Sequence, residues 1–381
     1  MSKKNFFIYL DQPSGKQQLE KVFPNKINLK NYNVKYISTQ KINFSNKQIN
    51  RYYKNSSKKD VPKFIKNISS VKKLENFLKK LGKRDIVFVR ERSVTADRKK
   101  NFDLNLFEKY KIKTIFLDYN PWIPCNFKKK PFMNIIRLIW KLYNDLMNYL
   151  FQKDYSPKYI IGSGQFTEKK YANKKYINYI NTPSLWINFE GNYKKKNFIT
   201  YVDENIFFSR DQFLFGDYKN HKKVSNINLF LKNLISFFQI IEKKFNSKVI
   251  ISCSNKYIYS KNLFGGRKIY YGKTLQLISQ SKLVVGHRSD ALYQALYSKT
   301  PVLLLKSKYF YLRKNTYIDS RSVNHFNKNA HYIEDYIKKK VYPNISIDKE
   351  FYSSLLKKYF LTPGLKRENF SKKIEKEFNR I

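Results

Sequence analysis

The segment that most constrains the fold of this chain is residues 281–305, SKLVVGHRSDALYQALYSKTPVLLL. It begins with a short apolar run at 282–285, which is typical of a buried parallel strand. Gly286 interrupts that run, and helix-forming residues follow over 291–297. A second apolar run comes at 302–305, after Pro301. A strand, a turn, a helix and a strand in this order predict a βαβ unit and therefore a parallel sheet.

The turn of this unit carries the polar residues of most interest. In a βαβ unit the helix begins at the carboxyl edge of the sheet, where α/β proteins bind their ligands. The N–H groups at the helix N-terminus favour a phosphate there. We therefore predict that Gly286, His287, Arg288, Ser289 and Asp290 contact the substrate. The alternative is an ordinary turn in which Ser289 and Asp290 cap the helix and the polar side chains face water.

The rest of the chain alternates between strand and helix patterns. Further strands are expected at 5–10, 32–38, 85–89, 113–117, 158–161, 176–180, 198–202, 248–252 and 268–271. Helices are expected at 71–81, with Gly82 as a C-terminal cap, and at 102–110, 226–245, 274–281 and 332–340. This series predicts two Rossmann-like α/β domains, with parallel sheets facing an interdomain cleft and a C-terminal returning helix. We place the domains at 1–195 and 196–348, with helices at 349–381 packing back toward the first.

The charge of the chain is extreme. It has 77 Lys and Arg against 28 Asp and Glu, a formal net charge of +49. Nucleic acid, an anionic membrane surface or a polyanionic substrate would each explain this charge. Drift toward A/T-rich codons would explain it without any partner, because Lys, Asn, Ile, Tyr and Phe are all abundant. The lysines are scattered singly and in threes, at 128–130, 194–196 and 338–340, which argues against a basic nucleic-acid arm.

The cysteines and the apolar segments bear on the compartment. Cys125 and Cys253 are the only cysteines, and they have neither metal-ligand spacing nor a disulfide framework. The N-terminus lacks the apolar core of a signal peptide, and no run is long enough to cross a membrane. We expect a cytoplasmic protein. The segment 132–151 is amphipathic, and it predicts either a core helix of the first domain or a helix lying on an anionic membrane.

Four stretches carry a resemblance to a known family: KYIIGSGQ at 158–165, ITYVDENIFF at 199–208, FFQIIEKKFNSKVIIS at 237–252 and residues 264–305. They resemble bacterial capsule and lipopolysaccharide biosynthesis proteins of the GT-B glycosyltransferase type, distantly like sialyl- and polysialyltransferases. The resemblance implies a metal-independent transfer from a nucleotide-activated sugar, with a CMP-linked acidic sugar as one suggested donor. One departure is that Ser252–Asn255 stands where such proteins usually have a His-Pro pair.

The chemistry of glycosyl transfer suggests which side chains would act. The phosphate of the leaving nucleotide must be neutralised, for which Gly272, Lys273 and Thr274 form a second expected contact beside the 286–290 turn. Histidine is rare in this chain, with only four residues, and His287 is the one at the predicted ligand edge. We therefore predict that His287 is catalytic. The alternative for Lys273 is an ordinary surface lysine.

The acceptor hydroxyl must also lose a proton to a general base. Carboxylates follow several of the expected strands, and for each of them the alternative is a solvated turn residue. We rank Asp11 first, because it directly precedes a turn containing Gly15. The other candidates are Glu91, Asp118, Asp203 and Glu204.

The resemblance implies a glycosyltransferase that acts on a glycan or lipid-linked acceptor, in contact with the anionic inner membrane and with no cofactor, metal or specific nucleic acid. Two alternatives remain from other classes. One is a catalytically inactive carbohydrate- or nucleotide-binding homologue, which the missing His-Pro pair favours. The other is a basic nucleic-acid-binding protein, which would use the charge directly. A sugar-nucleotide epimerase would share the two-domain architecture, but no residue pattern favours it.

Overall fold

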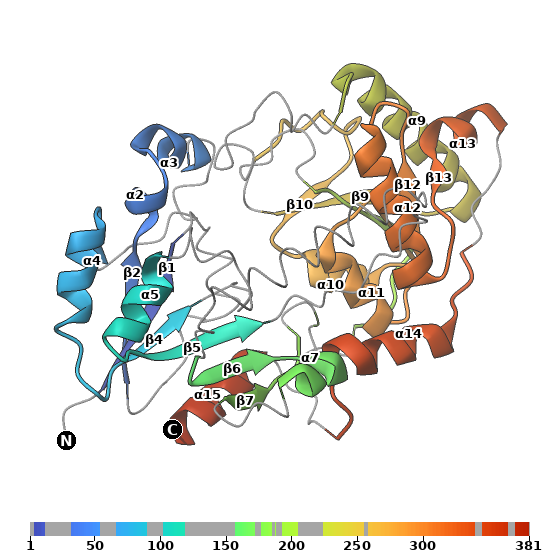
Figure 1. The fold of residues 1–381 in the computed structure, drawn as a ribbon. Coiled ribbons are helices and arrows are strands. Elements are labelled where there is room, and N and C mark those ends of the chain that lie inside the picture. The colour runs from blue at the N-terminus through green and yellow to red at the C-terminus, as the bar shows by residue number, and fades with distance from the viewer. Residues whose placement is uncertain are drawn as a thin grey trace, which may run out of the picture.

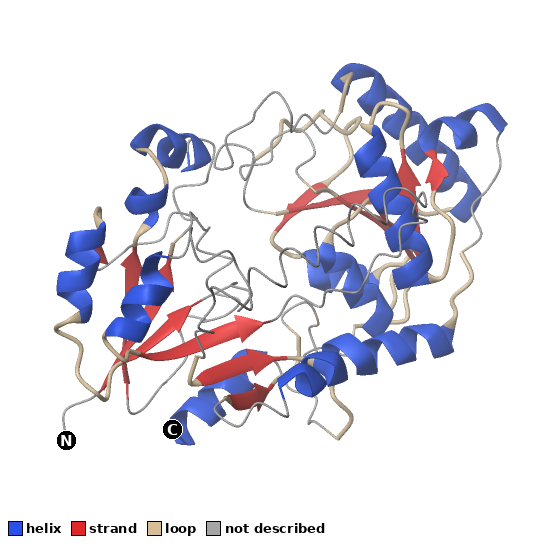
Figure 2. Cartoon of the chain, viewed as in Figure 1, coloured by secondary structure: helices blue, strands red, loops and turns tan. Residues whose placement is uncertain are grey.

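The computed structural model describes residues 4–11, 32–53, 66–89, 102–118, 157–171, 177–184, 187, 193–204, 224–254, 258–339, 345–364 and 370–380. They form two parallel sheets flanked by helices, one in each half of the molecule (Figures 1 and 2). Glu91, Cys125, the amphipathic segment 132–151 and the turn at Gly15 lie outside the described residues.

Seven described strands form the first sheet, in the order β3-β2-β1-β4-β5-β6-β7. Their sequences are apolar on both faces, as expected for a parallel sheet covered on both sides. The central strand β4 is buried at every residue. The strands are β1 (Lys4–Leu10), β2 (Tyr32–Ser38), β3 (Lys66–Asn67), β4 (Ile86–Val89), β5 (Lys113–Asp118), β6 (Tyr159–Gly162) and β7 (Asn178–Asn181).

Helices cover one face of this sheet. Leu74 and Leu78 from α4 and Phe107 from α5 pack with Phe7 and Tyr9 of β1. The helix α4 starts after Ser70, whose hydroxyl accepts a hydrogen bond from the main-chain N–H of Lys73, the third residue of the helix. The described helices of this half are α2 (Gln40–Asn43), α3 (Asn46–Tyr53), α4 (Val71–Leu78), α5 (Phe102–Lys109) and α7 (Gly164–Tyr171).

Six described strands form the second sheet, in the order β10-β9-β8-β11-β12-β13. The strand β11 lies inside this sheet, between β8 and β12, and all four of its residues are buried. The strands are β8 (Phe198–Val202), β9 (Lys248–Cys253), β10 (Ile269–Tyr271), β11 (Leu283–Gly286), β12 (Val302–Lys306) and β13 (His331–Tyr332).

The long helix α9 packs its apolar stripe, including Phe230, Leu234 and Phe238, into the core of the second sheet. It begins at the cap Asn226 and ends at Asn246, which adopts the left-handed conformation common at helix C-termini. The described helices of this half are α9 (Ile227–Phe245), α10 (Thr274–Gln280), η3 (Asp290–Tyr293), α11 (Gln294–Tyr297), α12 (Leu312–Phe326) and α13 (Ile333–Lys339).

The last helices connect the two halves (Figure 1). The helix α14 (Lys349–Leu355) continues as the π-helical turn η4 (Leu356–Phe360), which packs against α7. Gly164, with φ +73°, lies so close to η4 that a side chain there would collide with the main chain of Tyr359. The helix α15 (Phe370–Arg380) then buries Ile374 and Phe378 against the first sheet, on the face opposite to α4 and α5.

The predicted fold class is confirmed: the chain has two Rossmann-like parallel sheets and a C-terminal helix that returns to the first. The arrowheads of β5 and β6 point toward the second half in Figure 2. Some details of the prediction were wrong. The helix that starts at Val71 ends at Leu78 rather than near Gly82, and its C-terminal cap is Lys79. The helices α7 and α12 were not predicted.

Candidate functional site

The predicted turn lies at the carboxyl end of β11, at the edge of the sheet where a ligand was expected. The short 3-10 helix η3 starts the helical segment, and α11 continues it. The hydroxyl of Ser289 accepts a hydrogen bond from the Ala291 N–H at 3.3 Å and caps this helix. A Cβ at Gly286 would come within 3.2 Å of the Leu292 side chain, so the absence of a side chain at Gly286 allows η3 to pack close to the strand.

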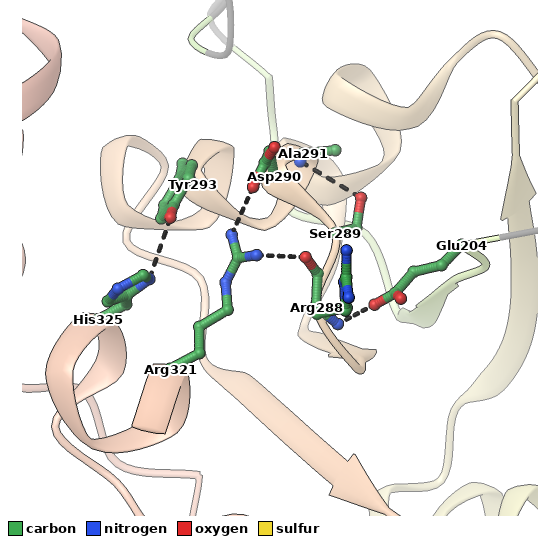
Figure 3. A network of polar contacts seen from close by, with 8 residues as sticks. All are labelled: Glu204, Arg288, Ser289, Asp290, Ala291, Tyr293, Arg321 and His325. Carbon is green, nitrogen blue, oxygen red and sulfur yellow. Dashed lines mark hydrogen bonds and ion pairs between the residues drawn. The ribbon is translucent and has the colours of Figure 1, made fainter. Parts of the chain in front are cut away.

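A buried arginine from α12 holds this turn in place (Figure 3). The Arg321 guanidinium donates to the main-chain oxygen of Arg288 and to Asp290 Oδ1, the latter at 3.1 Å. It also lies over the ring of Tyr293, with Cζ 4.7 Å from the ring centroid. The Arg321 side chain is only 1% exposed, so the guanidinium itself is shielded from water. The turn is therefore fixed by α12.

A carboxylate from a neighbouring strand also meets the turn (Figure 3). Glu204, just after β8, accepts a hydrogen bond from the main-chain N–H of Arg288. Two N–H groups of the turn, those of Arg288 and Ala291, thus bind protein oxygens. The Arg288 side chain is exposed and the Asp290 side chain is 42% exposed. What the turn offers to a ligand is therefore mainly the Arg288 guanidinium and the Ser289 hydroxyl.

His287 lies in the core beneath the turn and is fully buried. Its Nδ1 is 2.7 Å from the carbonyl oxygen of Leu305, so Nδ1 carries the proton and donates. Its Nε2, 2.9 Å from the Tyr201 hydroxyl, then accepts. Burial and the nearby Asp203 and Glu204 charges raise the pKa of Tyr201 well above its usual value, so it stays a donor. Through these two hydrogen bonds the His287 ring, at the end of β11, is linked to β8 and β12, and it is not exposed to a ligand.

The second predicted contact lies at the same edge of the sheet. Gly272, with φ +72°, follows β10, and its N–H donates to the Cys253 carbonyl at 3.0 Å. Lys273 is exposed. Thr274 starts α10, and its hydroxyl accepts a hydrogen bond from Ser252 at 2.9 Å. Three strand spacings separate β10 from β11, about 14 Å, so the two turns are distinct contacts.

The predicted bases occupy different surroundings. Asp11 follows β1 in the first sheet, and its carbonyl accepts a hydrogen bond from Asn43 at 3.3 Å. Asp118 is the last residue of β5 and pairs with Lys170 at 2.7 Å. Asp203 follows β8, is 5% exposed and accepts from the Tyr259 hydroxyl at 2.7 Å. Asp11 and Asp118 thus lie at the carboxyl edge of the first sheet, and Asp203 and Glu204 at that of the second.

Burial, together with the Asp203 carboxylate, raises the pKa of the Tyr259 hydroxyl and of the Cys253 thiol well above their usual ranges. Both groups therefore remain neutral, and Cys253 is not a thiolate nucleophile in this environment.

Among the residues that the structure describes, no cluster of three or more His, Cys, Asp or Glu side chains could hold a metal ion. None of the described helices is both long enough and apolar enough to span a bilayer.

Arg321 and Glu204 both contact the turn from other elements, and the sequence did not reveal these structural roles. Arg321 lies three residues after Ile318 and four before His325, and all three are buried on one side of α12. That spacing is a sign of a buried helix face. Because 77 residues of the chain are Lys or Arg, one more arginine did not stand out.

No protein-family model matches the chain, and no curated protein matches it either. Solved structures are similar in fold. The UDP-GlcNAc 2-epimerase of Methanocaldococcus jannaschii is 14% identical, over 99% of this chain and 98% of that one, with a TM-score of 0.42. The spinosyn forosaminyltransferase is 9% identical, over 100% and 94%, with a TM-score of 0.41. The Neisseria meningitidis UDP-GlcNAc 2-epimerase, solved with UDP-GlcNAc, is 13% identical over 99% and 100%, at 0.37. At these TM-scores the likeness does not decide between transferase and epimerase.

Proposed function

We propose that this protein is a glycosyltransferase that moves a sugar from a nucleotide-activated donor to a surface polysaccharide or lipopolysaccharide acceptor. One observation carries the proposal. The turn after β11 is held by the buried Arg321 and presents the exposed Arg288 side chain at the carboxyl edge of a parallel sheet. That edge is where α/β proteins bind nucleotides, and an exposed guanidinium on a main chain that is held in place suits a phosphate group.

In this proposal the second domain binds the donor. Arg288 and Lys273 neutralise the phosphate charge that grows as the sugar leaves, and Ser289 donates a hydrogen bond to a phosphate oxygen. A preformed turn costs little reorganisation, because Arg321 already fixes the Arg288 main chain. His287 contributes by position, since both of its ring nitrogens already have protein partners. Gly272 and Thr274 shape the second contact.

The first domain would bind the acceptor. Its sheet ends in Asp11 and Asp118, and we propose Asp11 as the base that takes the proton of the acceptor hydroxyl. Asp118 suits this role less well, because its carboxylate accepts from both Lys170 and Tyr171. A glycan or lipid-linked glycan is the proposed acceptor, and a CMP-linked acidic sugar is one proposed donor.

The test is titration calorimetry with CMP, UDP and GDP and their sugar conjugates. We expect saturable binding of one nucleotide. Arg288→Ala should raise its Kd about 10- to 100-fold, the range for a lost charge-assisted hydrogen bond. Lys248→Ala removes one exposed positive charge at the opposite, amino edge of the same sheet and should leave the Kd unchanged. Absence of saturable nucleotide binding, or equal losses in both variants, would refute the proposal.

A catalytically inactive homologue is the second candidate, and one observation favours it. Ser252, at the place where the family usually has a His-Pro pair, is buried and uses its hydroxyl to bind Thr274. This contact fills the end of β9 without supplying a group that could transfer a proton to the donor phosphate. Sugar-nucleotide turnover with purified lipid-linked glycans distinguishes the two candidates. Nucleotide binding with no transfer or hydrolysis would favour the inactive homologue.

A further inference from the structure

A pocket of about 550 Å³ lies between α7 of the first domain and the α14–η4 segment, away from the turns described above. Four lysines line it: Lys169 and Lys170 from α7, and Lys357 and Lys358 from η4. Gln165 and Ser354 are its polar lining residues, and no carboxylate takes part in the lining. The α7–η4 contact that joins the two halves of the chain therefore carries a concentration of positive charge.

Most of this charge is not neutralised by ion pairs among the residues that the structure describes. Lys170 pairs with Asp118 at 2.7 Å. In the described part of the chain, no acidic side chain forms an ion pair with Lys169, Lys357 or Lys358. Lys358 lies over the Tyr359 ring, 5.2 Å from its centroid. Three like charges around one concave surface repel one another, and a bound anion would relieve that repulsion.

An aromatic side chain distinguishes this pocket from a simple phosphate site. Phe166 lines the pocket and is 41% exposed, with its ring centroid 5.5 Å from that of Tyr359. A soluble phosphate ion is hydrophilic, so contact with an exposed phenyl ring would not stabilise its binding. Lysines beside an exposed aromatic ring are typical of protein surfaces that lie at the boundary between lipid headgroups and acyl chains.

We propose that this pocket binds the phosphate headgroup of an anionic membrane lipid, with Phe166 reaching the acyl boundary. The lysines supply the charge complementarity and Phe166 the apolar contact. The site lies outside both turns proposed to bind the nucleotide, so it is independent of the proposed function. It would place the joint between the domains on the membrane surface, where a lipid-linked acceptor is found.

The experiment is co-sedimentation of the purified protein with phosphatidylcholine vesicles, with and without phosphatidylglycerol. We expect binding only when phosphatidylglycerol is present. The triple variant K169Q/K357Q/K358Q should bind about 100-fold more weakly, since each lysine near an anionic surface contributes about fivefold. The matched control is K232Q/K243Q/K248Q, which removes the same charge from exposed positions on α9 and β9. It should bind within about fivefold of wild type.

Several outcomes would overturn the proposal. Equal losses in the two triple variants would show that net charge alone draws the protein to the vesicles. Lysine-dependent binding of glycerol 3-phosphate or of single-stranded DNA, without vesicle binding, would assign the pocket to a soluble anion or to nucleic acid.

Phe166→Ser should weaken vesicle binding and leave the weaker binding of glycerol 3-phosphate unchanged. Nucleotide titrations keep this proposal separate from the proposed function. The triple variant K169Q/K357Q/K358Q should bind nucleotide with wild-type affinity, because none of its three lysines belongs to the turns proposed to bind the nucleotide.

Discussion

Replacing Arg321 by methionine tests whether α12 holds the ligand-edge turn. The guanidinium makes two charge-assisted hydrogen bonds, to Arg288 O and Asp290 Oδ1, and lies over Tyr293. Methionine keeps most of the side-chain volume and removes the charge. The loss should therefore report the polar contacts and the stacking rather than a cavity.

The size of the effect follows from burial. Removing one partner of a buried ion pair costs about 3–5 kcal/mol. Here Arg321 is 1% exposed, but the Asp290 side chain is 42% exposed, so water can solvate the carboxylate that remains. The orphaned Arg288 carbonyl and the lost cation–π contact add to the cost, while the removed burial penalty of the guanidinium offsets part of it. We expect the free energy of unfolding to fall by about 2–3 kcal/mol.

Urea unfolding followed by circular dichroism measures this loss, and calorimetry measures nucleotide affinity on the same samples. Lys306→Met is the control. Lys306, in β12, pairs at 2.7 Å with Asp319, which lies on α12 as Arg321 does, and it also lies over the Tyr332 ring. Asp319 is 48% exposed, so this loss should stay near 1 kcal/mol. A double-mutant cycle of Arg321→Met with Asp290→Asn should show coupling. No coupling, or equal losses for Arg321→Met and Lys306→Met, would refute the reasoning.

Two further predictions concern the first domain. Hydrogen bonds from Tyr110 and the neighbouring lysine lower the pKa of Glu75 to about 2, so its stabilisation is complete above pH 4.5 and is lost toward pH 2. The difference in urea midpoint between wild type and Glu75→Gln should therefore narrow as the pH falls toward 2, and a difference that does not change with pH would contradict this. Gly164→Ala should lower the melting temperature more than Gly266→Ala. Both positions have positive φ, but only Gly164 is packed against a main chain; equal shifts would contradict this.

The strands of this protein could be predicted because their signal is local. The runs that became β1, β8, β9, β11 and β12 are short, apolar and bounded by turn residues, and a parallel sheet covered on both faces needs little else. The bounds of these strands differ from the prediction by at most one residue at either end. The parallel order follows from the alternation of strands and helices.

The helix α12 could not be found in the same way, because its buried residues are largely polar. Asn315, Arg321 and His325 are buried, and each forms a hydrogen bond with a partner distant in sequence or in a loop. Such polar residues are buried only where the fold supplies their hydrogen-bond partners. Their positions therefore produce no apolar periodicity from which the helix could be predicted.

The candidate site shows the same limit. The sequence placed His287 and Arg288 at the end of β11, where the structure also has them. It did not indicate that the imidazole would face inward to Tyr201 and Leu305, whereas an exposed Arg288 side chain was one of the two alternatives for the turn. Adjacent residues at the end of a strand point to opposite sides, and which side is buried depends on the helices that pack there.

The packing of α15 has a consequence for how the chain is made. Ile374 and Phe378 lie in the same cluster as Phe6 and Phe88, so this cluster joins residues from both ends of the sequence. At a synthesis rate of about 5–20 residues per second, Phe378 follows Phe6 by roughly 20–75 s. During that interval the part of the first sheet covered by α15 is left without its partner. The second domain, whose cluster draws on residues 187–360, is synthesised before the first domain can complete its core.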